Sequence, residues 1–154
     1  MILYLGSSSL IKLYIEEPHS DTIADWVKVS EIVATCRVAY TEIISVLDIR
    51  LRKGDLSKEN YDRALEKFNE DWQSFAKIDF DDFEAGNLIR KYGLTRFGAL
   101  HLSAAKLILN EYKLFSNTQS ADNGNSAVIL FFSSTDEDLC KAATVEGLKV
   151  LSSI

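Results

Sequence analysis

The sequence predicts an α/β domain with a mainly parallel sheet covered by helices on both faces. Short apolar segments alternate along the chain with longer segments in which apolar residues recur three or four positions apart. The short segments are apolar at nearly every position, which is typical of parallel strands that are buried on both faces. One proline and seven glycines punctuate the 154 residues, so we expect regular structure joined by short connections.

Five segments are predicted to be strands. The first is ended by Gly6, and the fourth is the strongest strand signal in the chain. The predicted strands cover residues 2–5, 31–35, 77–79, 127–132 and 148–151. In a parallel sheet of this kind, ligands bind beyond the carboxyl ends of the strands.

The predicted helices have recognisable ends. Pro18 should stop the first, Gly54 and Gly93 should close two others, and Ser57 should cap the helix that carries an apolar stripe as far as Phe75. Besides the helix that Ser57 caps, the predicted helices cover residues 8–17, 21–29, 38–53, 81–92, 98–112 and 136–146. Residues 116–126 are polar and are predicted to form a mobile loop.

The amino-acid composition is typical of a globular domain. With 47% apolar and 26% charged residues, the chain is predicted to be one domain over residues 1–154, and a disordered tail or a fibre is excluded. No apolar run reaches the roughly 18 residues of a membrane helix, and Met1 leads directly into an apolar segment, so we expect a cytoplasmic protein with no membrane partner. Cys36 and Cys140 are expected to be core residues without a disulfide.

The charge distribution argues against a general attraction to nucleic acid. Lys and Arg total 17 against 23 for Asp and Glu, a formal net charge of −6, so any RNA-binding surface must be local. Six cationic residues at or near predicted helix ends could rim an RNA groove, namely Arg50, Arg52, Lys53, Arg90, Lys91 and Arg96. We expect the first three to be solvated helix ends, and we expect Arg96 to contact phosphate.

Glu42 is anomalous because its predicted helix is apolar on nearly all sides. A buried charge without a partner costs several kcal/mol, so Glu42 should meet a cation, a metal ion or hydrogen-bond donors, or else be protonated. Taken alone, Glu42 is best explained by an arginine partner or by backbone donors. One such residue does not define a site.

Asp136 directly follows the fourth strand and opens a helix, so its carboxylate should face the crevice at the strand ends. The alternative is an ordinary helix-stabilising acid worth about 0.3–1 kcal/mol. His101 lies three residues after Gly98 and shares its helix face. A metal-ligand role is conceivable for His101, but a packed histidine bonded to a backbone carbonyl is the preferred interpretation.

Four separated segments, in this order, resemble the PIN domains and, within them, the VapC-type ribonuclease toxins of toxin–antitoxin pairs. The segments are residues 2–14 with 16–18, 40–43, 98–105, and 134–139 with 142–143 and 146–148. The resemblance implies a three-layer α/β/α sandwich whose five-stranded sheet has the order 3-2-1-4-5. It also implies a homodimer, an antitoxin-like protein partner, and four acids that hold Mg²⁺ or Mn²⁺ for cutting RNA.

Only two of the four acids of that family are present in this sequence. The second matches Glu42 and the fourth matches Asp136, but the first falls on Gly6 and the third on Gly98. Nothing in the local pattern requires glycine at either position. The two acids were lost either by natural decay of the catalytic site or when a toxic gene was disarmed in the laboratory; one lost aspartate should suffice for disarming, so two losses favour decay. Two carboxylates are a poor cage for a hard divalent cation.

Neighbouring side chains are weak substitutes for the missing acids. Asp138 lies two residues beyond Asp136, about 200° round a helix, and Asp48 lies six beyond Glu42, about 240° round, so both should point elsewhere. Serine hydroxyls could contribute weakly to metal or RNA binding; the candidates are Ser7, Ser8 and Ser134.

The leading functional hypothesis is a VapC-like protein with a degenerate nuclease site, retained for binding RNA through Ser7, Ser134 and Arg96, or for binding an antitoxin-like partner. Any metal bound by Glu42 and Asp136 should be held weakly. The alternative is an active Mg²⁺- or Mn²⁺-dependent endoribonuclease that uses those two acids. A small-molecule binder ranks last, because residues 6–9 form neither a dinucleotide fingerprint nor a P-loop.

A partner surface is also suggested by the aromatic residues. Helices that carry Tyr14, Trp26, Trp72 and Phe75 could form an apolar groove for an amphipathic antitoxin segment. Packing inside the monomer or at a dimer interface explains the same residues equally well.

Overall fold

The structure is a computed structural model that describes residues 1–118 and 129–152. Its centre is a parallel sheet in the order β3-β2-β1-β4-β5, as the predicted fold class requires. The strands are β1 (Ile2–Leu5), β2 (Ile32–Cys36), β3 (Ala76–Ile78), β4 (Leu130–Ser133) and β5 (Lys149–Val150).

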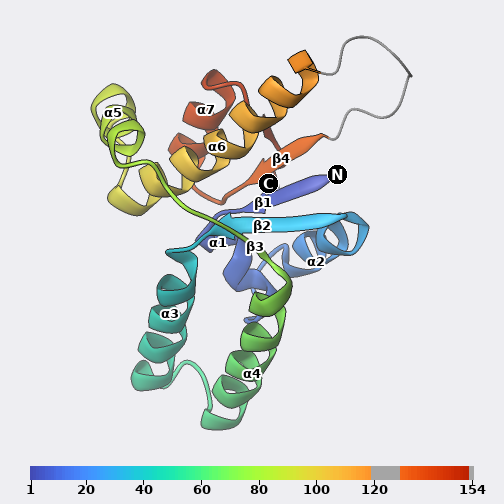
Figure 1. The fold of residues 1–154 in the computed structure, drawn as a ribbon. Helices are drawn as coiled ribbons and strands as arrows, with labels where there is room; N and C mark the ends of the chain where they lie inside the picture. Colours follow the sequence, from blue (N-terminus) through green and yellow to red (C-terminus); the bar gives the residue numbers. More distant parts are fainter. Residues whose placement is uncertain (119–128, 153–154) are drawn as a thin grey trace.

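Helices cover both faces of the sheet and complete a three-layer sandwich (Figure 1). One face carries α1 (Ser7–Leu10), the short 3₁₀ helix η1 (Ile11–Leu13), α2 (Ser20–Val29), α3 (Ala39–Lys53) and α4 (Lys58–Ser74). The other face carries α5 (Asp82–Tyr92), α6 (Arg96–Thr118) and α7 (Glu137–Val145). No helix in the described ranges combines the length and the apolar character needed to cross a membrane.

The central strand β1 shows why the sheet needs two helical layers. Leu3 and Leu5 pack into the core beneath α1–α4, whereas Ile2 and Tyr4 pack into the core beneath α5–α7. All four side chains are at most 3% exposed. The uninterrupted apolar run of β1 therefore reflects burial on both faces, as the sequence predicted.

The predicted helix over residues 8–17 is wrong in extent, because regular helix ends at Leu13 in η1. Side chains fold the next residues into a turn instead. Lys12 Nζ donates to the carbonyl of Pro18 at 2.7 Å, and the hydroxyl of Ser20 bonds to backbone groups upstream of it. Pro18 is therefore part of this turn and does not terminate the helix.

The prediction for α6 is too short at both ends. Thr95 Oγ1 accepts the backbone N–H of Gly98 at 3.2 Å, so the helix is capped at Thr95 and begins at Arg96. Residues 116–118, predicted as loop, belong to α6. The rest of that predicted loop, 119–126, and residues 127–128 of the predicted fourth strand lie outside the described residues.

The aromatic residues of α4 pack mainly inside the molecule. The ring of Phe68 lies 5.1 Å from Tyr14, 5.4 Å from Tyr40 and 5.6 Å from Trp72, measured between centroids. A groove of about 660 Å³ does lie between α2 and α4, but of the four aromatic residues predicted to form one, only Phe75 lines it. Packing within the monomer therefore accounts for Tyr14 and Trp72.

Glu146 ties together the three helices of the second layer. It accepts hydrogen bonds from Lys106 Nζ at 2.6 Å, Tyr92 Oη at 2.6 Å and Lys91 Nζ at 3.0 Å, and Lys106 also pairs with Glu84. The hydrogen bond from Lys106, followed by that from Tyr92, lowers the pKa of Glu146 from 4.5 to about 2. The charged carboxylate is therefore stabilised by folding.

We predict that Glu146→Gln lowers the free energy of unfolding by about 1–3 kcal/mol at neutral pH. Because the folded pKa lies below the ordinary value, this contribution is complete above about pH 4.5 and is lost as the pH falls towards 2. Urea unfolding of variant and wild type across this pH range should show the difference narrowing. The exposed Glu66 provides the control: Glu66→Gln should change stability little at any pH. A difference for Glu146→Gln that does not depend on pH would contradict the assignment.

Candidate functional site

A small pocket of about 150 Å³ lies at the carboxyl edge of the sheet, where β1 and β4 end. Its lining includes both residual acids, Glu42 from α3 and Asp136 before α7, and both glycines, Gly6 and Gly98. Four residues that are distant in the sequence, from Gly6 to Asp136, therefore line the same pocket. This is the edge at which open α/β sheets bind ligands.

His101, on α6, is the centre of the site. Its Nε2 lies 2.7 Å from Glu42 Oε1 and 2.7 Å from Ser7 Oγ, and its Nδ1 lies 2.8 Å from the hydroxyl of Tyr4. His101 is 3% exposed, and the Glu42 side chain is 17% exposed. The arginine or backbone partner expected for Glu42 is thus wrong, as is the backbone carbonyl expected for His101.

The proton positions follow from the partners. A carboxylate can only accept, so His101 Nε2 donates to Glu42. In a neutral ring Nδ1 then accepts from the hydroxyl of Tyr4. Burial is the main cause that raises the pKa of Tyr4 well above its usual 10, which keeps this hydroxyl protonated and able to donate.

Asp136 both lines the pocket and caps a helix. Its Oδ1 accepts the backbone N–H groups of Asp138 at 3.0 Å and Leu139 at 3.1 Å, the first donors of α7. Asp136 therefore both caps α7 and lines the pocket at the strand ends. One oxygen of Asp136 is committed to the fold in the same way that one oxygen of Glu42 is committed to His101.

Serine hydroxyls join α1 to the end of β4. Ser134 Oγ lies 3.2 Å from Ser8 Oγ and accepts the N–H of Asp136 at 3.1 Å, while Ser9 and Ser133 pair at 2.9 Å. Ser7, Ser8 and Ser134 line the pocket as predicted, but each already has a hydrogen-bond partner within the protein. They offer a ligand only their remaining hydrogen-bonding capacity.

Both glycines sit where the chain leaves little room. A Cβ at position 6 would lie 3.3 Å from the carbonyl oxygen of Ser133, and a Cβ at position 98 would lie 2.9 Å from Thr95 Oγ1. Neither glycine has a positive φ, so the constraint is close approach and not backbone conformation. Close approach, which the sequence did not reveal, therefore disfavours a side chain at position 6 and, in the present rotamer of Thr95, at position 98.

Neighbouring acids do not complete a metal site. Asp48 pairs with Arg52 at 2.9 Å, Asp138 is exposed, and neither lines the pocket, as helix geometry predicted. Within the described part of the chain, no three His, Cys, Asp or Glu side chains are placed to hold a metal ion. Mg²⁺ demands near-octahedral oxygen coordination. The residues present therefore do not fit the metal that the family resemblance implies.

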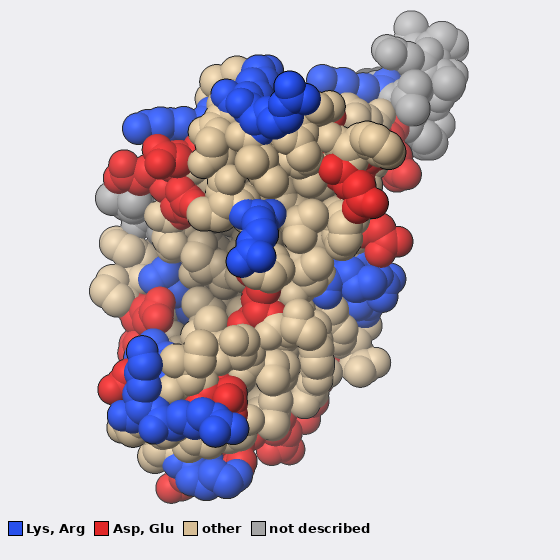
Figure 2. All heavy atoms as spheres, turned by 90° about the vertical axis from the view of Figure 1, so that its left-hand side faces the viewer, with Lys and Arg blue, Asp and Glu red and all other residues tan. Residues whose placement is uncertain are grey.

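The cationic residues do not form a single basic field. Figure 2, which looks onto this edge of the molecule, shows basic side chains in separate groups with acidic side chains nearby. Arg52 and Lys53 are exposed, as expected of solvated helix ends, whereas Arg50 is only partly exposed and pairs with Glu17 at 3.1 Å. Arg96 is exposed beside the pocket residue Phe97, but it is not itself part of the pocket lining.

Tyr4, Thr95 and Phe97 were not singled out from the sequence as site residues, although the structure places all three at or beside the pocket. A signal was available for Tyr4. It carries the only hydroxyl in the first apolar strand, and a buried tyrosine hydroxyl needs a partner. Thr95 and Phe97 carry no comparable pattern.

We predict that the bond between Glu42 and His101 contributes a coupling free energy of about 1–2 kcal/mol. A double-mutant cycle with Glu42→Ala and His101→Ala, followed by urea unfolding, measures it. The matched control is the exposed pair of Asp48 and Arg52, whose side chains are 44% and 78% exposed and whose coupling should stay below about 0.5 kcal/mol. Equal coupling in the two cycles would show that burial adds nothing to the bond.

Comparison with known proteins supports the fold. The sequence matches no family model and no curated protein. Among solved structures, the crystal structure of PAE2754 from Pyrobaculum aerophilum superimposes with a TM-score of 0.60 at 20% sequence identity, covering 97% of this chain and 92% of that one. At this identity the similarity shows that the two chains share a parallel α/β fold.

Proposed function

We propose that the chain is a VapC-like PIN-domain protein whose metal-dependent ribonuclease centre is degenerate and whose fold is retained to bind RNA or an antitoxin-like protein. The four sequence segments and the strand order support the family assignment. The pocket that unites Glu42, Asp136, Gly6 and Gly98 supports the assignment of the site. The homodimer implied by the resemblance stays a prediction.

The observation that carries the proposal is the internal bond from His101 to Glu42, at 2.7 Å. In a metal site of hard ligands, the carboxylate oxygens face the ion. Here an N–H group satisfies one oxygen of Glu42, and backbone N–H groups satisfy one oxygen of Asp136. One oxygen of each carboxylate is thus satisfied by a hydrogen bond from within the protein, which supports a site that does not need an ion.

The rim of the site is the part that could contact a nucleic-acid backbone, because the carboxylates of Glu42 and Asp136 inside the pocket repel phosphate. Ser7 and Ser134 can each still offer hydrogen-bonding capacity, and Arg96 is exposed beside the pocket. Backbone contacts of this kind position a strand and carry no sequence information directly. Since the net charge is −6, we expect weak, salt-sensitive binding that depends on these few residues.

We predict that millimolar Mg²⁺ or Mn²⁺ leaves the thermal unfolding midpoint unchanged and that the purified protein leaves RNA uncut. A ligand that binds only the folded state raises the midpoint, so the absence of a shift reports the absence of binding. Differential scanning calorimetry and a gel assay on labelled single-stranded RNA measure the two outcomes.

The alternative, an active endoribonuclease, has one observation in its favour, namely that Glu42 and Asp136 line the same pocket. Manganese-dependent cleavage of RNA that is abolished by Glu42→Gln would establish this alternative and overturn the proposal. Cleavage that survives Glu42→Gln would instead indicate a contaminating nuclease, which repeated purification should remove.

We predict that Gly6→Asp together with Gly98→Asp restores metal-dependent cleavage of RNA, because it returns an acid to both missing positions. The hydroxyl of Thr95 would lie 2.9 Å from the new Cβ at position 98. The restored variant should therefore also be made with Thr95→Ser, whose unbranched side chain can rotate away more easily. Manganese-dependent RNA cleavage and a metal-induced thermal shift are the readouts.

The single substitutions Gly6→Asp and Gly98→Asp serve as controls and should each show much less activity than the pair. Circular dichroism confirms that each variant is folded. A folded double variant that neither binds manganese nor cuts RNA, in either Thr95 background, would contradict the assignment of Glu42 and Asp136 as residual acids of a nuclease.

A further inference from the structure

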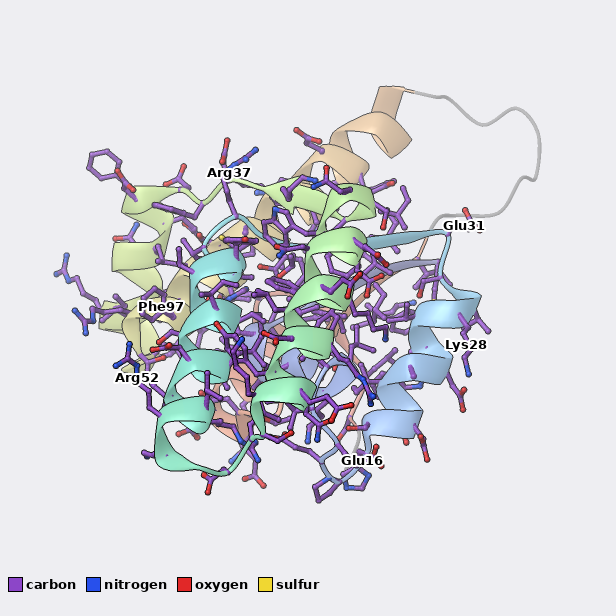
Figure 3. The ribbon with its side chains drawn as sticks, turned by 90° about the horizontal axis from the view of Figure 1, so that it is seen from below. Glu16, Lys28, Glu31, Arg37, Arg52 and Phe97 are labelled. Carbon is purple, nitrogen blue, oxygen red and sulfur yellow. The ribbon has the colours of Figure 1, made fainter. Side chains whose placement is uncertain are left out.

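Phe97 is an exposed aromatic residue at the rim of the pocket. It is the second residue of α6, its side chain is 47% exposed, and it is part of the pocket lining. In Figure 3, Phe97 and Arg52 project from the same side of the molecule. A large apolar ring that is half in water beside a polar pocket is available to stack on a flat ligand.

The packing of α6 does not depend on this ring. The buried positions of the same turn and the next, Ala99 and Leu102, are fully enclosed and belong to the core beneath α5–α7. The cap from Thr95 and the bonds of His101 fix the helix start independently. Phe97 is thus held in place by its neighbours while part of its ring stays free.

The surroundings of Phe97 fit a nucleotide better than an apolar ligand. Arg96, the preceding residue, is exposed and lies outside the pocket, and the pocket beside the ring is lined by the hydroxyls of Ser7 and Ser134 and by the carboxylates of Glu42 and Asp136. Because these carboxylates repel phosphate, a phosphate bound next to the ring should lie on the side of Arg96. Aromatic rings bind the flat faces of unpaired bases, while arginine and hydroxyl groups bind the phosphate between them. A base in a duplex has its faces covered, so only a single strand can use such a ring.

We propose that Phe97 is a stacking platform for an unpaired nucleobase of single-stranded RNA, with the adjoining phosphate held by Arg96. This inference rests on the proposed RNA-binding function and adds to it the residue that holds the base. The ring recognises the π-face common to all bases, so the contact itself should show little base preference.

The test is binding of a short single-stranded RNA that carries one 2-aminopurine, followed by the fluorescence of that base and by anisotropy of an end label. We expect wild type to quench the 2-aminopurine, and Phe97→Ala to weaken binding by about 5- to 100-fold and to abolish the quenching. Phe97→Trp should retain both within about threefold, since a larger aromatic face replaces the ring.

Phe83 provides the matched control, because it is 88% exposed on α5 and does not line the pocket. Phe83→Ala should leave affinity and quenching unchanged. Thermal unfolding of every variant shows whether a loss of binding comes from loss of fold, and Phe97→Trp separates the two effects if Phe97→Ala is unstable.

The outcomes distinguish this inference from the proposed function on which it rests. If wild type binds RNA and Arg96→Ala weakens the binding, but Phe97→Ala changes neither affinity nor quenching, the stacking inference is wrong and RNA binding stands. If wild type binds no RNA, the stacking inference is overturned together with the RNA-binding part of the proposed function. If Phe97→Ala alters only the oligomeric state measured by sedimentation, the ring belongs to a protein interface and the inference is also overturned.

Discussion

The hydrogen bonds of His101 join parts of the molecule that the sheet otherwise separates. Its ring extends from α6 in one helical layer to Tyr4 on the central strand and to Ser7 and Glu42 in the other layer. Such a meeting is possible only beyond the carboxyl end of β1, where no strand intervenes. The geometry of the pocket therefore depends on one buried imidazole with polar partners on both ring nitrogens.

The hydrogen bond between His101 and Glu42 also affects how the site could bind a metal ion. A buried carboxylate must be neutralised or hydrogen-bonded, and Glu42 achieves this with the N–H group of His101. A divalent ion would achieve it too, but would have to compete with that donor and find further ligands where Gly6 and Gly98 offer none. The bond to His101 thus explains how Glu42 is accommodated in the fold without a metal ion.

Local sequence signals were sufficient for much of the fold. The apolar run of β1, the serine cap of α4 at Ser57, and the glycines that end α3 and α5 were all placed correctly, because each depends on residues a few positions apart. The site depended on contacts that no local pattern encodes. Glu42 and His101 are 59 residues apart, and Tyr4 and His101 are 97 apart.

Side-chain hydrogen bonds determine two of the helix boundaries that were predicted wrongly. The first helix was predicted too long because Lys12 bonds to the carbonyl of Pro18, a side-chain contact that competes with helical propensity. The start of α6 was misplaced because the cap at Thr95, three residues before its partner Gly98, was not recognised in the sequence. Of the two residues that this error placed before the helix, Phe97 lines the pocket and Arg96 is exposed next to it in the sequence.

Glycine at position 98, the cap at Thr95, and the placement of Arg96 and Phe97 form one local structure. Thr95 Oγ1 accepts the N–H of residue 98 in a rotamer that would lie 2.9 Å from a Cβ at that position, whereas Ser57 caps α4 in the same way over Asn60, which has a Cβ. That cap fixes the first turn of α6 and, with it, the two rim residues. A side chain at position 98 would displace the Thr95 hydroxyl from its present rotamer, so the residue at position 98 and the cap of α6 are linked by one steric contact.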